Sequence, residues 1–291
     1  MNAALELAPS VQNAFASPEL SLADFATIAK IVQDLSGIQL SERKLGLVKS
    51  RLQKRLRVQR LSDFGSYIRL VQSPDGRDEL EELICAISTN VTGFNREPHH
   101  FTHFREKLVE KLAKKLTNGE SVRIWSAGCS NGSEAHTIAC AMLDAFPKVA
   151  NYDFRILATD IDKYSLNVGR SGLYSADMVS KMPSNTLSKW FKVTDGSYQL
   201  AQAPRDLVSF KHLNLMNSWP LKRKYDAIFC RNVLIYFSHE DQEKLFNKFA
   251  DHLLPEGQFF IGHSERVIGS ATGKFKSIGS TTYERTLRGS N

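Results

Sequence analysis

The chain has 291 residues, of which 42% are hydrophobic and 24% charged, as expected for a globular protein with one large or two modest domains. No run approaches the roughly 20 apolar residues of a membrane span, and the N-terminus lacks a secretion signal, so we expect a cytoplasmic protein without direct membrane insertion. Four scattered cysteines argue against structural zinc, and the net charge of +7 favours an acidic partner, whether nucleic acid, anionic lipid or protein.

The first third of the chain is predicted to be helical. Residues 1–20 mix Ala, Asn, Ser and Pro and are predicted to form a flexible tail. Over residues 21–89 the apolar side chains recur at helical spacing, which predicts a small all-α domain. We expect Ser21 to cap the first helix, Gly37 to end it, and Ser41 to cap a second helix.

That second helix is unusually basic. Eight basic residues stand against one acidic residue between Glu42 and Arg60. Four apolar side chains fall within an arc of about 80° and predict one buried stripe, Leu45, Val48, Leu52 and Leu56. The plain explanation of the basic residues is a solvated surface, and the alternative is docking on an acidic partner.

After residue 120, short apolar strands alternate with helices, which predicts a mostly parallel sheet with helices on both faces. The predicted strands are 122–126, 154–158, 207–210, 225–230 and 257–262. Residues from about 186 to 206 break this rhythm around the turn signal Asp195-Gly196. We therefore expect an insertion there, with possible short strands on either side of the turn.

Two stretches at the ends of predicted strands suggest a nucleotide-like ligand. Gly128 and Gly132 turn the chain from the first strand into a helix beginning near Glu134, at the edge where doubly wound folds bind nucleotides. Such a turn often only joins a strand to a helix. Asp160 ends the next strand and can accept both hydroxyls of a ribose, although a helix cap by Asp160 or Asp162 is the alternative.

Polar residues also gather in the segment between the two domains and after the fourth strand. Thr89, Asn90, Thr92 and Arg96 precede Pro98, which suits the first turn of a helix. Arg231 and Asn232 follow the fourth strand, where a substrate should meet the cofactor. His99 and His103 have helical i, i+4 spacing, but the sequence offers no third ligand, so we expect no metal.

Five motifs in order resemble the chemotaxis-receptor glutamate methyltransferases of the CheR family. They are Thr-Asn-x-Thr-x-Phe-x-Arg-Glu (89–97), Ser-Ala-Gly-Cys-Ser-x-Gly-x-Glu (126–134), Ala-Thr-Asp-Ile-Asp (158–162), Phe-Cys-Arg-Asn-Val-Leu-Ile-Tyr-Phe (229–237) and Gly-His-Ser-Glu (262–265). The resemblance covers about residues 21–286. It departs from the family at Ser133, Ala135 and His136, where Glu, Pro and Tyr are usual, and at Asn95, where Phe is usual.

The resemblance implies a fold and an activity. Residues 21–89 would form the receptor-docking helical domain, 90–97 a linker contributing to the cofactor site, and 98–291 a Rossmann-like class I methyltransferase domain. The insertion at about residues 186–206 would form a small, hairpin-like β-subdomain. The expected reaction is methyl transfer from S-adenosylmethionine to receptor glutamates. The alternative is a non-catalytic module that binds S-adenosylmethionine or docks on receptors.

The resemblance also assigns residues. Arg96 would meet the cofactor's carboxylate or orient the acceptor, Glu134 would pair with its ammonium, and Tyr236 would line the transfer site unless it is only a half-buried aromatic. The expected cofactor-binding residues are Asn90, Thr92, Arg96, Gly128, Glu134, Asp160, Asn214, Leu215, Asn232 and Val233. Arg51, Lys54 and Arg55 would dock on the receptor's cytoplasmic helical bundle. We expect a monomer, with no metal and no nucleic-acid partner.

Carboxylate methylation explains the absence of an evident catalytic base. A glutamate with a pKa near 4.3 is already ionised at neutral pH, so the enzyme mainly has to align two groups. Alignment can lower a barrier by about 7–11 kcal/mol. A nucleic-acid methyltransferase is disfavoured by Arg-Asn-Val-Leu (231–234) after the fourth strand, and a nicotinamide oxidoreductase by the lack of Gly-x-Gly-x-x-Gly.

Overall fold

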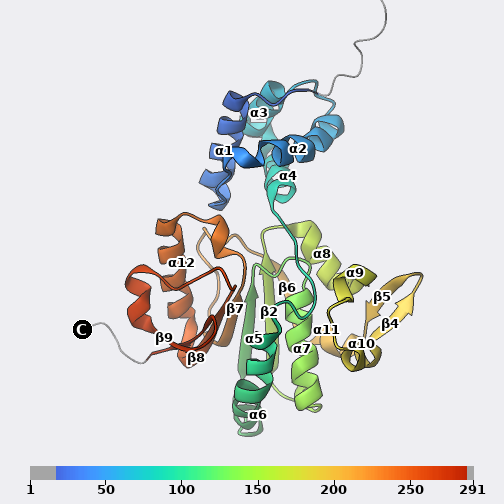
Figure 1. The fold of residues 1–291 in the computed structure, drawn as a ribbon, viewed down its shortest axis with the longest axis vertical. Helices are drawn as coiled ribbons and strands as arrows, with labels where there is room; N and C mark the ends of the chain where they lie inside the picture. The colour runs from blue at the N-terminus through green and yellow to red at the C-terminus, as the bar shows by residue number, and fades with distance from the viewer. Residues whose placement is uncertain (1–17, 287–291) are drawn as a thin grey trace, which may run out of the picture. The chain divides into compact units, whose positions relative to one another are not determined.

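The computed structural model describes residues 18–286, and its internal contacts divide the chain into two compact units (Figure 1). Among the described residues, one unit comprises 18–32 together with 40–87, and the other comprises 33–39 together with 88–286. Most of the predicted tail lies outside the described residues. Its last residue, Leu20, is buried.

The first unit is helical, as predicted. Its elements are α1 (Leu22–Ser36), the 3₁₀ turn η1 (Glu42–Lys44), α2 (Leu45–Gln59), α3 (Phe64–Gln72), η2 (Pro74–Gly76) and α4 (Arg77–Ile87). Ser21 caps α1, since its Oγ accepts a hydrogen bond from the Asp24 N–H at 3.0 Å. The cap predicted at Ser41 is wrong, because Ser41 precedes η1 and makes no side-chain cap bond. Three of the four residues in the predicted stripe on α2 are buried, namely Val48, Leu52 and Leu56.

The second unit contains a seven-stranded sheet in the order β6-β2-β1-β7-β8-β10-β9. Its parallel part is β1 (Val122–Ala127), β2 (Phe154–Asp160), β6 (Val208–His212), β7 (Tyr225–Cys230) and β8 (Leu253–Ile261). The antiparallel edge is β10 (Thr282–Arg285) and β9 (Phe275–Gly279), preceded by η6 (Gly269–Lys274). All five predicted strands are confirmed, and with them the predicted fold class.

Helices cover the sheet on both faces. One buried cluster joins α5 (Pro98–His103), a π-helical turn (Phe104–Leu108), α6 (Val109–Thr117) and α7 (Ser133–Ala145) to the sheet. A second cluster lies under α12 (His239–His252) and is rich in aromatic rings around Trp125 and Phe249. The remaining connections include η4 (Val149–Asn151), α8 (Lys163–Ser171) and η5 (Leu234–Tyr236). Pro98 occupies the first turn of α5, as predicted.

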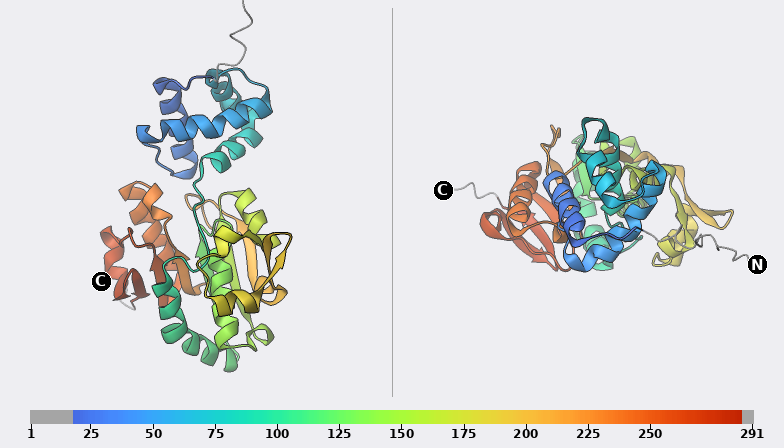
Figure 2. Two further views of the ribbon diagram at one scale, coloured as in Figure 1. Left: turned by 45° about the vertical axis from the view of Figure 1, so that its right-hand side comes forward. Right: turned by 90° about the horizontal axis from the view of Figure 1, so that it is seen from above.

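The β-subdomain is larger than the sequence indicates (Figure 2). A separate three-stranded sheet has the order β3-β5-β4, with β3 (Leu173–Ser175), β4 (Phe191–Thr194) and β5 (Ser197–Leu200). The predicted hairpin is confirmed, with Asp195 and Gly196 at φ 47° and 74°. The predicted start of the subdomain at residue 186 is wrong, because its sheet already begins at β3. The sequence did not reveal β3, since three residues are too few to show an alternating pattern of apolar and polar side chains. The subdomain's helices are α9 (Ala176–Val179), α10 (Ser184–Trp190) and α11 (Gln202–Asp206).

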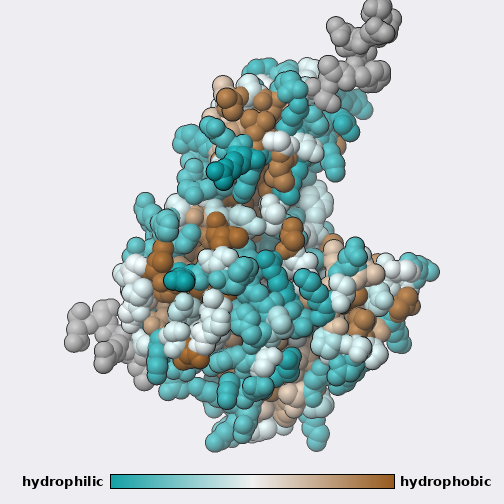
Figure 3. Space-filling view, in the orientation of Figure 1, coloured by the Kyte–Doolittle hydropathy of each residue, from teal (hydrophilic) through white to brown (hydrophobic). Residues whose placement is uncertain are grey.

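Figure 3 shows one face of the molecule, coloured by hydropathy. In the view of Figure 3, hydrophobic side chains occur in small groups between polar ones. None of the helices between residues 18 and 286 has both the length and the apolar composition of a membrane span.

Candidate active site

A small pocket lies at the carboxyl edge of the parallel sheet, where β1 and β7 end. It is lined by Thr92, Gly93, Arg96, Phe101, Gly128, Cys129, Glu134, Arg231 and Asn232. Five of the predicted cofactor-binding residues, from three separate motifs, therefore meet in one place: Thr92, Arg96, Gly128, Glu134 and Asn232.

The turn after β1 depends on glycine. Gly128 has φ 70°, and the backbone N–H groups of Gly128 and Cys129 donate to the Thr159 carbonyl at 2.8 and 2.9 Å. A Cβ atom on Gly128 would collide with the side chain of Val233. The turns that follow β1 and β7 are therefore packed directly against each other.

Gly128→Ala should lower affinity for S-adenosylmethionine by about tenfold or more, because both the positive φ and the collision push the two turns apart. Gly119→Ala is a matched control, since Gly119 has φ 83° but no atom within 4 Å of an added Cβ. Calorimetric titration of both variants tests this. Equal affinities in the two variants would show that the contact with Val233 does not shape the site.

The two aspartates after β2 have different roles. Asp160 is buried, and its carboxylate accepts the backbone N–H of Ser130 at 2.7 Å and of Asp162 at 2.9 Å. Burial raises the pKa of Asp160. Asp162 is the cap of α8, accepting from the Tyr164 N–H at 2.9 Å, and it also holds the side-chain amide of Asn90 at 2.5 Å. The capping alternative thus belongs to Asp162, while Asp160 closes the glycine turn.

Arg231 is the central charge beneath the pocket. Its side chain is 3% exposed and lies between two carboxylates, at 3.0 Å from Glu134 and 3.4 Å from Glu97. It also donates to the Arg96 carbonyl and stands over the Phe101 ring. Glu134 further accepts from the Ser126 hydroxyl at 2.7 Å. The resemblance gave Glu134 to the cofactor's ammonium, but in the structure its partner is Arg231.

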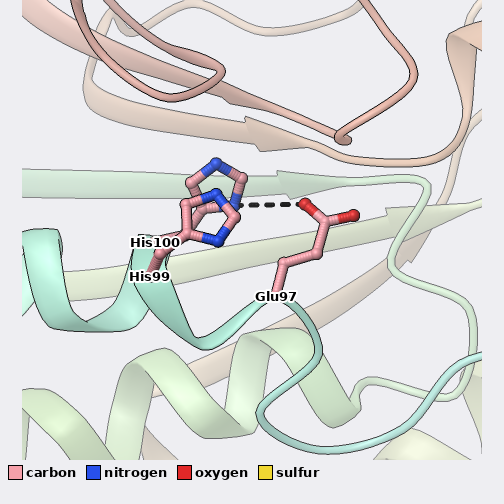
Figure 4. A group of neighbouring side chains, drawn as sticks. All are labelled: Glu97, His99 and His100. Atoms are coloured by element: carbon pink, nitrogen blue, oxygen red, sulfur yellow. Dashed lines mark ion pairs between the residues drawn. The ribbon is translucent and has the colours of Figure 1, made fainter.

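Glu97 joins this network to His100, which Figure 4 draws beside it, and to His263. Burial alone would raise its pKa, but hydrogen bonds from His263 and the charge of Arg231 outweigh burial and lower the pKa of Glu97 to about 2. His100 lies 3.5 Å from the same carboxylate, and its burial lowers its own pKa to about 3, so its imidazole is neutral at pH 7. Glu97 is therefore ionised and its charge is already balanced.

The same residues include a candidate group of metal ligands found within residues 18–286. Glu97, His99 and His100 offer ligand atoms within 4.8 Å of one another. His103, the i, i+4 partner considered from the sequence, instead pairs with the Gln258 side chain at 3.1 Å. Since Glu97 is engaged with Arg231 and His263, we do not assign a metal to this group.

Glu265 shapes the turn after β7, a role that the sequence did not reveal. Its carboxylate is 4% exposed and accepts the backbone N–H groups of Asn232, Val233, Leu234, Ile235 and Gly262. These bonds hold Asn232 at φ 59°. In the sequence, Glu265 was noticed only as part of the motif Gly-His-Ser-Glu (262–265), and no role was predicted for it.

Comparison with known proteins agrees with this architecture. Residues 23–88 match the family model "CheR methyltransferase, all-alpha domain", and residues 90–284 match "CheR methyltransferase, SAM binding domain". The chain belongs to the CheR methyltransferase family. The pocket therefore lies in the S-adenosylmethionine-binding domain of a CheR methyltransferase.

Named relatives cover nearly the whole chain. A "Probable chemotaxis protein methyltransferase" of Rhizobium etli is 43% identical over 259 residues, which is 87% of this chain and 96% of that protein. The "Chemotaxis protein methyltransferase" of Borreliella burgdorferi is 39% identical, covering 85% and 89% of the two chains. The protein of that name from Escherichia coli is 34% identical, covering 91% of each.

Three of the four departures from the usual CheR pattern, at His136, Ser133 and Asn95, have a definite structural setting. His136 is fully buried, its Nδ1 lies 2.7 Å from the Tyr174 hydroxyl, and burial lowers its pKa to about 3, so it is neutral. Ser133 lies 3.2 Å from the Thr92 hydroxyl and ties α7 to the linker. Asn95 has φ 54°, a conformation that asparagine adopts more readily than phenylalanine.

Other residues assigned from the CheR resemblance lie outside the pocket lining. Asn214 donates to the Leu35 carbonyl at 2.7 Å, and Leu215 is buried in the aromatic-rich cluster. Tyr236 is half-buried on η5, and its carbonyl accepts from the Gln39 N–H at 2.8 Å. The structure thus does not bring these three to the residues that line the pocket.

The basic helix of the CheR all-α domain is less free than its sequence suggests. Arg55 forms two hydrogen bonds with Glu79, at 2.9 and 2.6 Å, and also pairs with Glu82 at 3.1 Å. Arg51 donates to the carbonyls of Ala86 and Ile87. These two arginines therefore hold α2 to α4, which leaves Lys54 as the exposed member of the predicted docking set.

Proposed function

We propose that this protein transfers the methyl group of S-adenosylmethionine to glutamate carboxylates of chemoreceptors, giving methyl esters that serve sensory adaptation. The observation that carries this proposal is the convergence of family motifs on one pocket within the S-adenosylmethionine-binding domain. The relatives are named as chemotaxis protein methyltransferases.

The pocket suits a reaction without a general base. Arg96 lines it and donates to the Val91 carbonyl at 2.8 Å, which leaves other guanidinium N–H groups to meet a carboxylate. We propose that Arg96 binds the cofactor's carboxylate or the acceptor glutamate. Each Glu134 oxygen retains a second lone pair, so Glu134 can still accept from the cofactor's ammonium. For Tyr236, Asn214 and Leu215 the support is the resemblance alone.

Incubation with S-adenosylmethionine and purified receptor cytoplasmic fragments tests the proposal. Peptide mass spectrometry should place the added methyl group on glutamate side chains. Methylation of lysine, of nucleic acid or of no partner would contradict the proposed function, and the last result would favour the non-catalytic alternative.

We propose that receptor docking uses the exposed basic residues Arg43, Lys54 and Arg57, in place of Arg51 and Arg55. Replacing all three with alanine should slow methylation several-fold at low receptor concentration and leave affinity for S-adenosylmethionine unchanged. Added salt should slow the wild type in the same way, because it screens exposed charges.

Arg69→Ala with Arg77→Ala is the matched control, since both side chains are exposed on other helices of the same domain. Equal methylation rates in the two variants, or no effect of salt, would mean that α2 has no docking role.

We also expect methylation not to depend on a tether at the receptor's C-terminus. Strand β4 has only four residues and is followed at once by the turn at Asp195, so an added strand would gain few backbone hydrogen bonds. Calorimetry with the receptor's C-terminal peptide measures this directly. Micromolar affinity, together with loss of methylation when the receptor tail is removed, would contradict the prediction.

A further inference from the structure

The positive charge of this chain is concentrated after residue 87. Residues 1–87 contain 11 Lys and Arg against 11 Asp and Glu, whereas residues 88–291 contain 27 against 20. The excess charge therefore does not come from the basic helix α2, whose arginines are partly balanced by α4. The methyltransferase domain therefore has a cationic surface of its own.

A basic groove lies at the amino edge of the parallel sheet, and it has a volume of about 290 Å³. Its floor is apolar and comprises Leu157, Pro220, Leu221 and Tyr225. Its rim is cationic and comprises Arg123, Arg155, Lys222 and Arg223.

Most of the cationic side chains of the rim are free to bind an anionic partner. Arg155, Lys222 and Arg223 are exposed, and no carboxylate among the described residues pairs with them. Arg123 is the exception, because Asp153 binds its guanidinium at 2.5 Å. Three uncompensated cations around one apolar floor make this groove attractive to an anionic partner.

The groove exists because the connection between the parallel strands β6 and β7 contains no helix. Parallel strands are normally joined by helices that cover the sheet. Residues 213–224 connect β6 to β7 without one. As a result, Arg155 and Leu157 on β2, together with Ser209 on the edge strand β6, face outward beside that loop.

The lining indicates the occupant. Its charged side chains are all donors, and no carboxylate or amide side chain is present to read the N–H groups of a nucleotide base. An apolar floor with a cationic rim complements a helix that has leucine-like residues on one face and carboxylates on its flanks. Such a helix would occupy the place of the absent crossover helix.

We propose that the basic groove binds an acidic amphipathic helix of a partner protein. The groove and the cofactor pocket lie at opposite ends of the strands. For the six residues of β1 that separation is roughly 20 Å. A partner bound in the groove therefore leaves the pocket open, and the enzyme can be held by one protein while it modifies another.

Fluorescence anisotropy with the full-length protein tests the proposal. The probe is a designed helical peptide with leucines on one face and glutamates on the others, compared with a scrambled peptide of equal composition. Arg155→Glu with Lys222→Glu should weaken binding of the amphipathic peptide about tenfold or more. Saturating S-adenosylmethionine should not displace the peptide.

Lys107→Glu with Lys114→Glu is the matched control, because it makes the same charge change at exposed residues elsewhere in the domain. Leu221→Ser tests the floor without changing charge, and it should also weaken binding. No binding of the amphipathic peptide, equal binding of the scrambled one, or equal losses in both charge-reversal variants would overturn the proposal. Tighter binding of a single-stranded oligodeoxynucleotide at the same residues would overturn it in favour of a nucleic-acid surface.

Discussion

Arg231→Ala is expected to lower the free energy of unfolding by about 3–5 kcal/mol and to abolish S-adenosylmethionine binding. The reason is that Arg231 is the shared counterion of Glu97 and Glu134, which are themselves only 10% and 13% exposed. Without it, two neighbouring carboxylates are left beneath the pocket with like charge. Urea unfolding and calorimetric titration of the full-length variant measure the two effects.

Arg123→Ala is the matched control for this change. Arg123 also lies on the central sheet, but its partner Asp153 is 56% exposed, so its loss should cost about 1 kcal/mol or less. If the Arg231 and Arg123 variants are equally stable and both bind cofactor, the buried network is not essential.

The stability difference between the wild type and the Arg231 variant should depend on pH in a definite direction. In the wild type the pKa of Glu97 is lowered to about 2 from 4.5, so its contribution to stability is present above pH 4.5 and is lost as the pH falls towards 2. In the Arg231 variant the pKa of Glu97 should rise, because its cationic partner is gone. The stability difference between wild type and variant should therefore narrow between pH 7 and pH 4. A constant difference would show that another interaction causes the instability.

Asp160→Ala is expected to weaken S-adenosylmethionine binding at least about tenfold, because hydrogen bonds from two ribose hydroxyls to a carboxylate contribute about 1.5–3 kcal/mol each. The structure adds a cost in stability. The Ser130 and Asp162 N–H groups lose their acceptor, and unsatisfied buried groups cost about 1–3 kcal/mol each. Calorimetry and thermal unfolding measure the two effects separately.

Asp160→Asn and Asp162→Ala distinguish ribose binding from loop closure. The amide keeps one acceptor oxygen, so Asp160→Asn should retain more stability than Asp160→Ala and still lose affinity. Asp162→Ala removes the cap of α8 and should cost about 0.5–2 kcal/mol. Wild-type affinity in Asp160→Asn would mean that Asp160 only closes the glycine turn.

Much of the fold could be predicted from local patterns. Strands β1, β7 and the end of β8 are short apolar runs, and the helices α8 and α12 begin at side-chain caps. The turn at Asp195-Gly196 and the start of α5 at Pro98 follow from residues with restricted or unusual backbone preferences. Strand β3 could not be predicted in this way, because three residues form a strand only when β5 lies beside them.

The electrostatic network of the site could not be derived from spacing. Arg231 and Glu97 are 134 positions apart, so only the folded sheet brings them together. Contacts between helices are likewise invisible in the sequence. Arg51 and Arg55 were therefore predicted to dock on the receptor, whereas in the structure they bind residues of α4. Buried arginines need partners, so the acids of the neighbouring motifs were a usable signal for Arg231.

The release of methanol by alkali tests the central claim most directly. Receptor cytoplasmic fragments are methylated with S-adenosylmethionine carrying a labelled methyl group, and the washed product is treated with base. The account predicts volatile labelled methanol from fragments treated with the wild type, and far less with Asp160→Asn at limiting cofactor. Label that stays bound to the receptor in base, or no label at all, would contradict the assignment of this protein as a glutamate methyltransferase.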